Sequence, residues 1–251
     1  MPNLPHAELP KPFPKTVVML GTGWNAVLDG VKPQKVISYK ELFGVDASVP
    51  GHEGKLVIAT VKNKRVAFMQ GRLHMYEGYT AEEVTLPIRV FAEAGMKRLL
   101  VTSAVGALNP KYTVGDFVIV QDLLTLFLAL DNPVKGPVFT DMSEVFDEKW
   151  RQQAVEACVK LKLPFQQGVH AFYHGPNFET PADKMALRNL GADICGMSMT
   201  PEVIMAKALG IKVLGLSLVT NLAFVKHAHK DVLAAANRSS KKMAALIKNV
   251  L

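Results

Sequence analysis

Short apolar runs rich in β-branched residues alternate with amphipathic segments along most of this chain. Runs typical of strands lie at 16–20, 55–61, 65–69, 97–102, 116–121, 168–174, 192–197 and 211–220. Segments with helical periodicity lie at 80–94, 143–162, 182–190, 201–209 and 230–250. Strands that alternate with helices predict an α/β fold with a central mixed β-sheet flanked by helices. Because the 251 residues show no break in composition, we expect a single domain.

Several of these elements have local boundary signals. Thr80 and Glu83 have the spacing of a capping box at the start of the helix at 80–94, and Gly95 follows it as a stop signal. Pro87 is expected to kink this helix, because proline lacks an amide proton and crowds the preceding turn. The runs at 55–61 and 65–69 indicate a β-hairpin. The final helix carries an apolar stripe formed by Val232, Ala236, Met243, Leu246, Ile247 and Val250.

The first fifteen residues contain five prolines and no apolar core typical of a signal peptide. Residues 1–15 are therefore expected to form an extended arm before a domain at 16–251. No apolar run reaches the ~20 residues of a membrane span. Cys158 and Cys195 are far apart and outside any CxxC pattern, which predicts a cytoplasmic setting without disulfides or zinc. The charge of +7 is spread along the sequence, which suits small anions and indicates neither a nucleic-acid partner nor a membrane.

Polar and glycine-rich segments directly follow most of the expected strands. They are residues 21–23, 71–78, 103–110, 175–180, 196–202 and 220–224. In open α/β sheets, ligands bind beyond the carboxyl ends of the strands, where such segments meet. Segments that are far apart in the sequence are therefore expected to converge on one pocket.

Five motifs in these segments carry a family resemblance. In their order and spacing, "QGRLHMYEGY", "GALNP", "GPNFET", "GMSMTPEV" and "SLVTN" resemble the motif set of the trimeric purine nucleoside phosphorylases. The similarity runs from Val17 to the C-terminus. It implies a nucleoside phosphorylase fold and reversible phosphorolysis of inosine, guanosine and their deoxy forms to a free purine base and ribose 1-phosphate. It also implies a homotrimer with inorganic phosphate as co-substrate and with neither a metal nor an organic cofactor.

The resemblance assigns a phosphate site, which its residue chemistry supports. The implied phosphate-binding groups are Thr22, Arg72, His74, Ser198 and the backbone amide of Ala104. A guanidinium binds phosphate oxygens through two parallel hydrogen bonds, and a hydroxyl beside backbone amides is a common anion-binding arrangement. The implied ribose-binding residues are Tyr76, Met197 and His229. The "HAH" triplet at 227–229 also has the residue type of a metal ligand pair, but no further ligands stand at suitable spacing.

The implied base site consists of Phe178, Glu179 and Asn221, and the implied catalytic residues are Glu179, Asn221 and His74. An aromatic ring offers a face to the purine. An ionised carboxylate accepts hydrogen bonds from N1–H and, in guanine, from the 2-amino group. Asn221 is suited to N7 of the departing base. Because adenine lacks an N1 proton in its usual form, this pair predicts a preference for inosine and guanosine over adenosine.

Three features differ from the family pattern. Thr22 stands where the family more often has Ser. The segments at 122–142 and 222–228 are shorter than their family counterparts, and the latter corresponds to a lid over the base. The family places a Phe from a neighbouring subunit over the ribose, where this chain has Ala129, with Phe127 two residues away.

Four alternative functions remain open at this stage. "GTGWNA" at 21–26, with Glu41 twenty residues after Gly21, fits a dinucleotide-binding fingerprint. A methylthioadenosine or methylthioinosine phosphorylase is a sister activity, although Glu179, Asn221 and His74 disfavour it. A catalytically weak nucleoside-binding homologue is compatible with the shortened segments. A hydrolase that uses water is disfavoured by the complete set of anion-binding residues.

Overall fold

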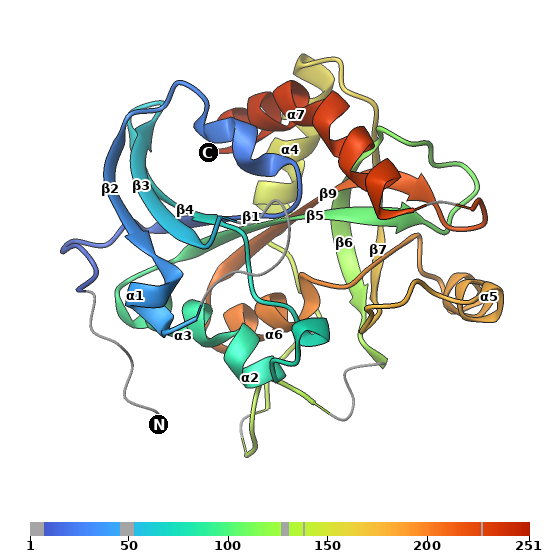
Figure 1. Cartoon of the computed structure of the whole chain (residues 1–251), viewed down its shortest axis with the longest axis horizontal. Helices are drawn as coiled ribbons and strands as arrows, with labels where there is room; N and C mark the ends of the chain where they lie inside the picture. The colour runs from blue at the N-terminus through green and yellow to red at the C-terminus, as the bar shows by residue number, and fades with distance from the viewer. Residues whose placement is uncertain (1–7, 46–52, 127–130, 138, 227) are drawn as a thin grey trace.

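The computed structural model describes residues 8–45, 53–126, 131–137, 139–226 and 228–251. Its strands are β1 (Thr16–Leu20), β2 (Pro33–Ser38), β3 (Lys55–Val61), β4 (Lys64–Gln70), β5 (Arg98–Ala107), β6 (Phe117–Leu124), β7 (Phe165–Phe172), β8 (Ile194–Gly196) and β9 (Lys212–Leu222). They form one mixed sheet in the order β2-β3-β4-β1-β5-β8-β7-β6-β9 (Figure 1). The predicted α/β fold with a mixed sheet is thus confirmed.

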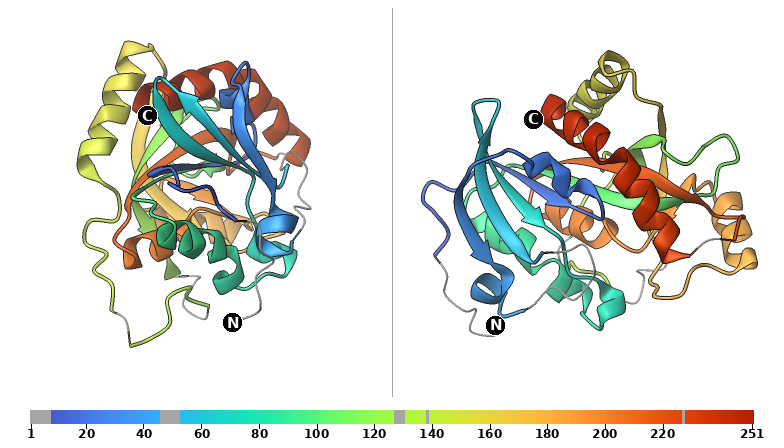
Figure 2. Two further views of the ribbon diagram at one scale, coloured as in Figure 1. Left: turned by 90° about the vertical axis from the view of Figure 1, so that its left-hand side faces the viewer. Right: turned by 45° about the horizontal axis from the view of Figure 1, so that its top comes forward.

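Helices cover both faces of this sheet. The α-helices are α1 (Tyr39–Phe43), α2 (Ala81–Val84), α3 (Leu86–Glu93), α4 (Glu148–Lys160), α5 (Pro181–Asn189), α6 (Thr200–Ala208) and α7 (His229–Val250). The described residues also form the 3-10 helices η1 (Trp24–Leu28) and η2 (Met75–Glu77). Figure 1 shows α4 and α7 above the strands and α1, α2, α3 and α6 below them, and Figure 2 shows the same division in two further views.

Half of the sheet closes on itself. Strand β9 pairs in parallel with β5 and antiparallel with β6, and β8 pairs antiparallel with β5 and in parallel with β7. Strands β5, β8, β7, β6 and β9 therefore form a continuous ring of hydrogen-bonded neighbours. Closure of this kind satisfies strand edges that would otherwise need water or another chain.

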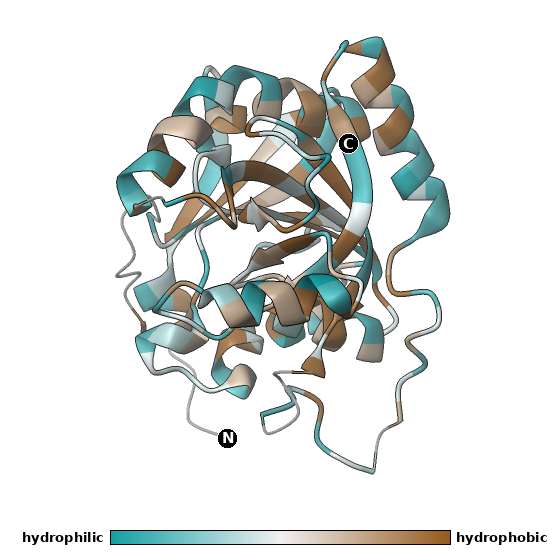
Figure 3. Ribbon diagram, turned by 90° about the vertical axis from the view of Figure 1, so that its right-hand side faces the viewer, coloured by the Kyte–Doolittle hydropathy of each residue, from teal (hydrophilic) through white to brown (hydrophobic). Residues whose placement is uncertain are grey.

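The core lies on both faces of the sheet, because successive side chains in a strand point to opposite sides. In β1, Val17 and Met19 pack in the cluster on the α3 and α6 side, whereas Val18 and Leu20 pack in the cluster on the α4 and α7 side. All four side chains are buried. In Figure 3 the apolar strands lie between helices whose outer surfaces are largely polar.

Most predicted elements are present, but several boundaries differ. The predicted capping box at Thr80 and Glu83 is formed, whereas the single kinked helix at 80–94 is wrong. Two short helices, α2 and α3, flank Thr85 instead, and Pro87 lies in the first turn of the second, where its missing amide proton is tolerated. Helix α4 begins at Glu148 rather than at 143, because the Asp147 side chain caps it by accepting from the Trp150 amide.

Strands β5 and β9 extend further toward the C-terminus than predicted, and one strand and one helix were not predicted at all. β5 continues to Ala107 and β9 to Leu222, so the polar residues expected in loops there lie inside paired strands. Strand β2 and helix α1 had no expected counterpart. Four of the six residues of β2 are exposed, so it lacks the apolar alternation of a half-buried strand.

The backbone conformation is informative at two connections, the turn between β3 and β4 and the segment after β1. The predicted hairpin of β3 and β4 turns through Lys62 and Asn63, both with positive φ, as a two-residue hairpin turn requires. After β1 the chain forms the short 3-10 helix η1 instead of the α-helix that a dinucleotide-binding unit needs.

The end of the N-terminal segment packs on the domain. Residues 1–7 of the expected arm lie outside the described residues. Phe13 is buried and stacks on Phe91 of α3 with ring centroids 5.1 Å apart, and the Pro12 carbonyl accepts a hydrogen bond from Arg65. The boundary between arm and domain at residue 15 stays a prediction.

A threonine hydroxyl in β5 is expected to be important for stability. The buried Thr102 hydroxyl accepts a hydrogen bond from the Gly21 amide and donates one to the Met19 carbonyl, both at 2.9 Å. Thr102→Val keeps the shape but leaves the Gly21 amide unpaired, which should lower the free energy of unfolding by about 1–3 kcal/mol in urea denaturation. Thr60→Val, at an exposed position in β3, is the control. Equal losses in both variants would contradict this role.

A second prediction concerns pH. His170 in β7 is fully buried, and burial lowers its pKa from 6.5 to about 4. The unfolded chain therefore binds this proton at a higher pH than the folded chain, so the free energy of unfolding should fall as pH drops from about 6.5 to about 4. His170→Phe should remove up to about 3 kcal/mol of this decline. His174→Phe, at an exposed position, should leave the decline unchanged; equal pH profiles for the two variants would refute the prediction.

Candidate active site

Segments from seven parts of the chain meet around a cavity of about 440 Å³. Three of them follow β1, β4 and β7, and two belong to the last residues of β5 and β9. The end of β8 with the residues after it and the start of α7 complete the wall. All residues predicted from the sequence for the site line this cavity, namely Thr22, Arg72, His74, Tyr76, Ala104, Phe178, Glu179, Met197, Ser198, Asn221 and His229. The expected convergence of distant segments is confirmed.

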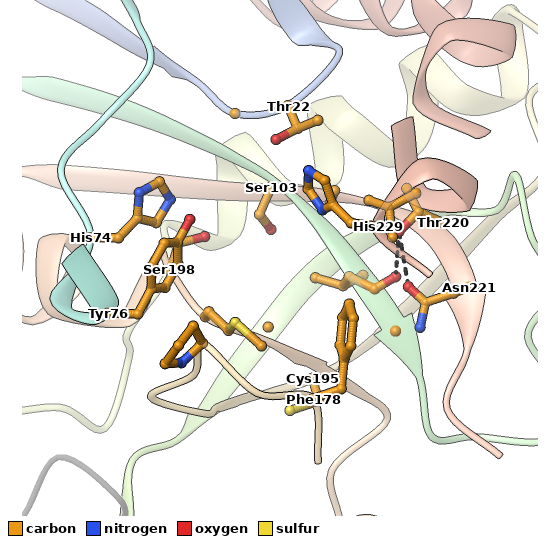
Figure 4. A pocket seen from close by; sticks show the side chains of 18 of the residues that line it. Thr22, His74, Tyr76, Ser103, Phe178, Cys195, Ser198, Thr220, Asn221 and His229 are labelled. Carbon is orange, nitrogen blue, oxygen red and sulfur yellow. Dashed lines mark hydrogen bonds between the residues drawn. The ribbon is translucent and has the colours of Figure 1, made fainter. Parts of the chain in front are cut away.

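The cavity has two chemically distinct sides. In Figure 4, His74, Tyr76 and Ser198 lie on one side, and Thr220 and Asn221 lie on the other. Hydroxyl and imidazole groups near a buried guanidinium characterise the first side, which suits an anion. An aromatic ring, an amide and a carboxylate characterise the second side, which suits a flat heterocycle.

Arg72 is held rigidly at the anion side. Its side chain is only 2% exposed, and Nη1 lies 3.3 Å from Oε1 of the equally buried Glu202. Nη2 donates to the Thr102 carbonyl. The turn before Arg72 is fixed as well, because the Tyr39 hydroxyl donates to the Gly71 carbonyl at 2.8 Å. These contacts fix the orientation of a charge that would be costly to bury without a partner.

His74 is a neutral imidazole with a defined tautomer. Glu77 Oε2 lies 2.9 Å from both the His74 backbone nitrogen and His74 Nδ1. Because a carboxylate only accepts, Nδ1 carries the proton, which leaves Nε2 as the acceptor. Burial lowers the pKa of His74, although the contact with Glu77 opposes the shift. The ring stacks on Tyr76 with centroids 4.5 Å apart, and burial raises the pKa of Tyr76 to about 12, so that phenol remains a donor.

Ser198 and Thr22 are presented by tight turns. Ser198 lies just before α6, and the next residue, Met199, has φ of 73°, a conformation that costs energy for a residue with a side chain. The first turn of α6 therefore lies close to the cavity, where the amides of a helix N-terminus favour an anion. Thr22 lies between Gly21 and Gly23, and Gly23 has φ of 83°.

Asn221 is oriented by its neighbour in β9 and by β5. The Thr220 hydroxyl lies 3.1 Å from Asn221 Oδ1 and 3.2 Å from the Val105 carbonyl, so its single proton is shared between these two acceptors (Figure 4). The amide oxygen thus faces Thr220, and Nδ2 carries the protons that the amide can donate. Gly106 lies opposite Asn221 in the β5–β9 pairing, and a Cβ there would come within 2.9 Å of Nδ2. The Asn221 amide can therefore occupy this position because residue 106 is a glycine.

The loop from β7 to α5 supplies the aromatic and the carboxylate. Asn177 Nδ2 donates to the Phe178 carbonyl at 3.1 Å, and Thr180 caps α5 in a capping box with Asp183. Glu179 Oε1 accepts from the Cys195 thiol at 3.1 Å. Phe178 is 40% exposed and lines the cavity, so part of its side chain is accessible to a ligand.

Three predicted residues remain, and all of them line the cavity: Ala104 in β5, Met197 and His229. His229 is the first residue of α7 and is exposed. Met197 is half-buried beside Gly175, and a Cβ on that glycine would come within 2.4 Å of the Met197 sulfur. Met197 follows β8 and His229 begins α7, whereas Arg72 follows β4, so the three residues reach the cavity from different elements.

Sequence reasoning missed five polar residues of the site. They are Glu77, Glu202, Cys195, Ser103 and Thr220. Glu77 is three residues after His74 in a quoted motif, so its proximity to the histidine was a usable signal. Glu202 is in another quoted motif, 130 residues from Arg72, and only the fold brings the two together. Ser103 begins a segment that was expected at the pocket, whereas Cys195 belongs to an apolar strand and gave no such signal.

The remaining expectations concern three individual residues, metal binding, membrane spans and the cysteines. Ala129, Phe127 and His227 lie outside the described residues. Within the described ranges, no cluster of three or more His, Cys, Asp or Glu side chains is arranged to hold a metal ion. Over the same ranges, every helix is too short or too polar to span a membrane. Both cysteines are free and buried.

Known proteins share both the sequence and the fold. The profile of the phosphorylase superfamily matches residues 15–251. Purine nucleoside phosphorylase of Bos taurus is 37% identical over 247 residues, which cover 92% of this chain and 86% of that protein. Purine nucleoside phosphorylase 1 of Bacillus subtilis is 38% identical, with 88% and 82% covered.

Solved structures agree with these relatives. Schistosoma mansoni purine nucleoside phosphorylase in complex with inosine superposes with a TM-score of 0.87 at 36% identity, covering 94% of this chain and 89% of that one. Another structure of that enzyme is in complex with adenosine. Similarity of this extent in both sequence and fold establishes the family. The chain belongs to the phosphorylase superfamily, and within it to the purine nucleoside phosphorylases.

Proposed function

We propose that this protein is a purine nucleoside phosphorylase that converts inosine or guanosine and inorganic phosphate to a free purine base and ribose 1-phosphate. One observation carries the proposal most directly. A buried guanidinium, Arg72, and a base-recognition pair, Glu179 and Asn221, line the same cavity. A sugar between these groups has its anomeric carbon accessible to an anion on one side and its base on the other.

The phosphate side supplies the nucleophile. Arg72, Ser198, Thr22 and the Ala104 amide hold phosphate by charge-assisted and neutral hydrogen bonds. His74 Nε2 accepts from a protonated phosphate oxygen, because its Nδ1 proton is engaged by Glu77. A phosphate oxygen then forms a bond to C1′ of the ribose while the C1′–N9 bond breaks. The electron pair of the broken bond stays on the purine.

The base side stabilises this departing purine. Asn221 Nδ2 donates to N7 as negative charge develops on the ring, or its oxygen accepts from N7 once the base is protonated. Glu179 accepts from N1–H, and Phe178 covers one face of the ring. A group that stabilises charge formed only in the transition state raises the rate rather than the affinity.

Other properties are part of the same proposal. Tyr76, Met197 and His229 contact the ribose, with His229 at the 5′-hydroxyl. The chemistry above uses phosphate as the co-substrate and requires no organic cofactor. We also propose a cytoplasmic homotrimer, in keeping with the family resemblance.

Two other activities have specific arguments against them. A methylthioadenosine phosphorylase must bind a 6-amino purine, whereas Glu179 and Asn221 favour a 6-oxo purine. A catalytically weak nucleoside-binding homologue would not need the buried ion pair of Arg72 and Glu202, which costs desolvation energy and orients a charge toward the cavity.

The first test is phosphate dependence. Purified protein should release hypoxanthine from inosine only when phosphate is added, as measured by chromatography. Arg72→Gln combined with Glu202→Gln removes both buried charges together, which limits the folding penalty. This variant should lose about 100-fold or more in kcat/KM for phosphate. Arg89→Gln with Glu82→Gln removes an exposed ion pair of 3.2 Å and should retain activity.

Each of the alternative outcomes of this assay would indicate a different function for the protein. Cleavage of inosine without phosphate would indicate a hydrolase. Binding of inosine without cleavage would indicate the nucleoside-binding homologue. Faster cleavage of methylthioadenosine than of inosine would indicate the sister activity.

A second test concerns the base. Asn221→Asp replaces the amide donor with a carboxylate, which is suited to accept from a 6-amino group. The ratio of kcat/KM for adenosine to that for inosine should therefore rise at least roughly tenfold, in keeping with the size of discrimination by buried polar groups. An unchanged ratio in a correctly folded variant would show that Asn221 does not contact the base.

A further inference from the structure

A thiol lies in the wall of the cavity at its base-recognition side. Cys195 in β8 is 3% exposed and lines the cavity beside Phe178, as Figure 4 shows. It lies opposite Gly106 in the β5–β8 pairing, and Gly106 lies opposite Asn221 in the β5–β9 pairing. The thiol and the Asn221 amide therefore flank the same residue of β5.

The thiol contacts the carboxylate assigned to the base. Cys195 Sγ donates to Glu179 Oε1 at 3.1 Å. A carboxylate only accepts hydrogen bonds, so the thiol must be the donor. Burial and the neighbouring Glu179 raise the pKa of Cys195, which keeps the thiol protonated at neutral pH. The contact is therefore a permanent donor–acceptor pair rather than one that titrates.

This contact links a loop residue to the sheet. Glu179 is in the connection between β7 and α5, where the neighbouring contacts are made by Asn177 to the Phe178 backbone and by the Thr180 cap. Cys195 belongs to a strand that is hydrogen-bonded on both sides. The thiol thus holds one carboxylate oxygen against a rigid element.

The consequence for base recognition depends on how many donors the base presents. Hypoxanthine presents one donor at this edge, N1–H, which one carboxylate oxygen satisfies. Guanine presents two adjacent donors, N1–H and the 2-amino group, which match both oxygens of a carboxylate. When the thiol already occupies Oε1, the second guanine donor must share that oxygen.

We propose that Cys195 is a positioning and specificity-determining residue that engages one oxygen of Glu179 and so biases the site toward inosine over guanosine. This inference rests on the proposed function, because it assigns Glu179 to the purine. It adds a residue whose effect is exerted through Glu179 rather than through contact with the reacting atoms.

The test compares substitutions that separate hydrogen bonding from packing. Cys195→Val is close in size, suits a strand and cannot donate, whereas Cys195→Ser keeps the donor. The ratio of kcat/KM for guanosine to that for inosine should rise roughly five- to tenfold in the valine variant, which is the size of effect expected from one ordinary hydrogen bond. It should stay close to the wild-type ratio in the serine variant. Cys158→Ala, in α4 and outside the residues lining the cavity, is the control.

Two results would overturn the inference. One is a valine variant that keeps the wild-type ratio, and the other is a serine variant that shifts the ratio as much as valine does. Equilibrium binding of free hypoxanthine and free guanine, measured by calorimetry, gives the same comparison without catalysis. If the wild-type protein cleaves no nucleoside, the proposed function fails, whereas the ratio of the two dissociation constants still tests the role of Cys195.

Discussion

Strand β5 is the element on which both the sheet and the cavity depend, because it pairs with three other strands. At Thr102 its hydroxyl fixes the end of β1, and its carbonyl accepts from Arg72. Four residues further on, Gly106 separates Asn221 from Cys195. That interval is about 13 Å along a strand. One rigid strand therefore sets both ends of the cavity and the distance between them.

The electrostatic design of the anion side follows from burial. A guanidinium and a carboxylate are both removed from water, and Glu202 compensates and orients the buried charge of Arg72. Burial lowers the pKa of His74 and so favours the neutral imidazole, and the contact with Glu77 places the proton on Nδ1. The anion side thus presents a guanidinium that is paired with Glu202, together with an imidazole that is paired with Glu77. Such preorganisation requires little rearrangement when an anion enters.

The sequence was most informative for the site, where polar motifs lie near the ends of strands. The family resemblance of the motifs implied every residue proposed for the site, and all of these residues line the cavity. The extension of β5 and β9 was not predictable from local pattern, because polar residues that resemble a loop are paired by closure of the sheet. β2 was missed because an exposed edge strand lacks apolar alternation. The contact between Cys195 and Glu179 joins residues whose proximity depends on strand order, which no local motif encodes.

The central claim is that one cavity holds an anion and a purine at opposite ends. A crystal structure of the protein with hypoxanthine and ribose 1-phosphate tests it most directly. The account predicts the phosphate group against Arg72 and Ser198, and the purine ring between Phe178 and Asn221. A phosphate bound away from Arg72, or a base bound outside the cavity, would contradict it.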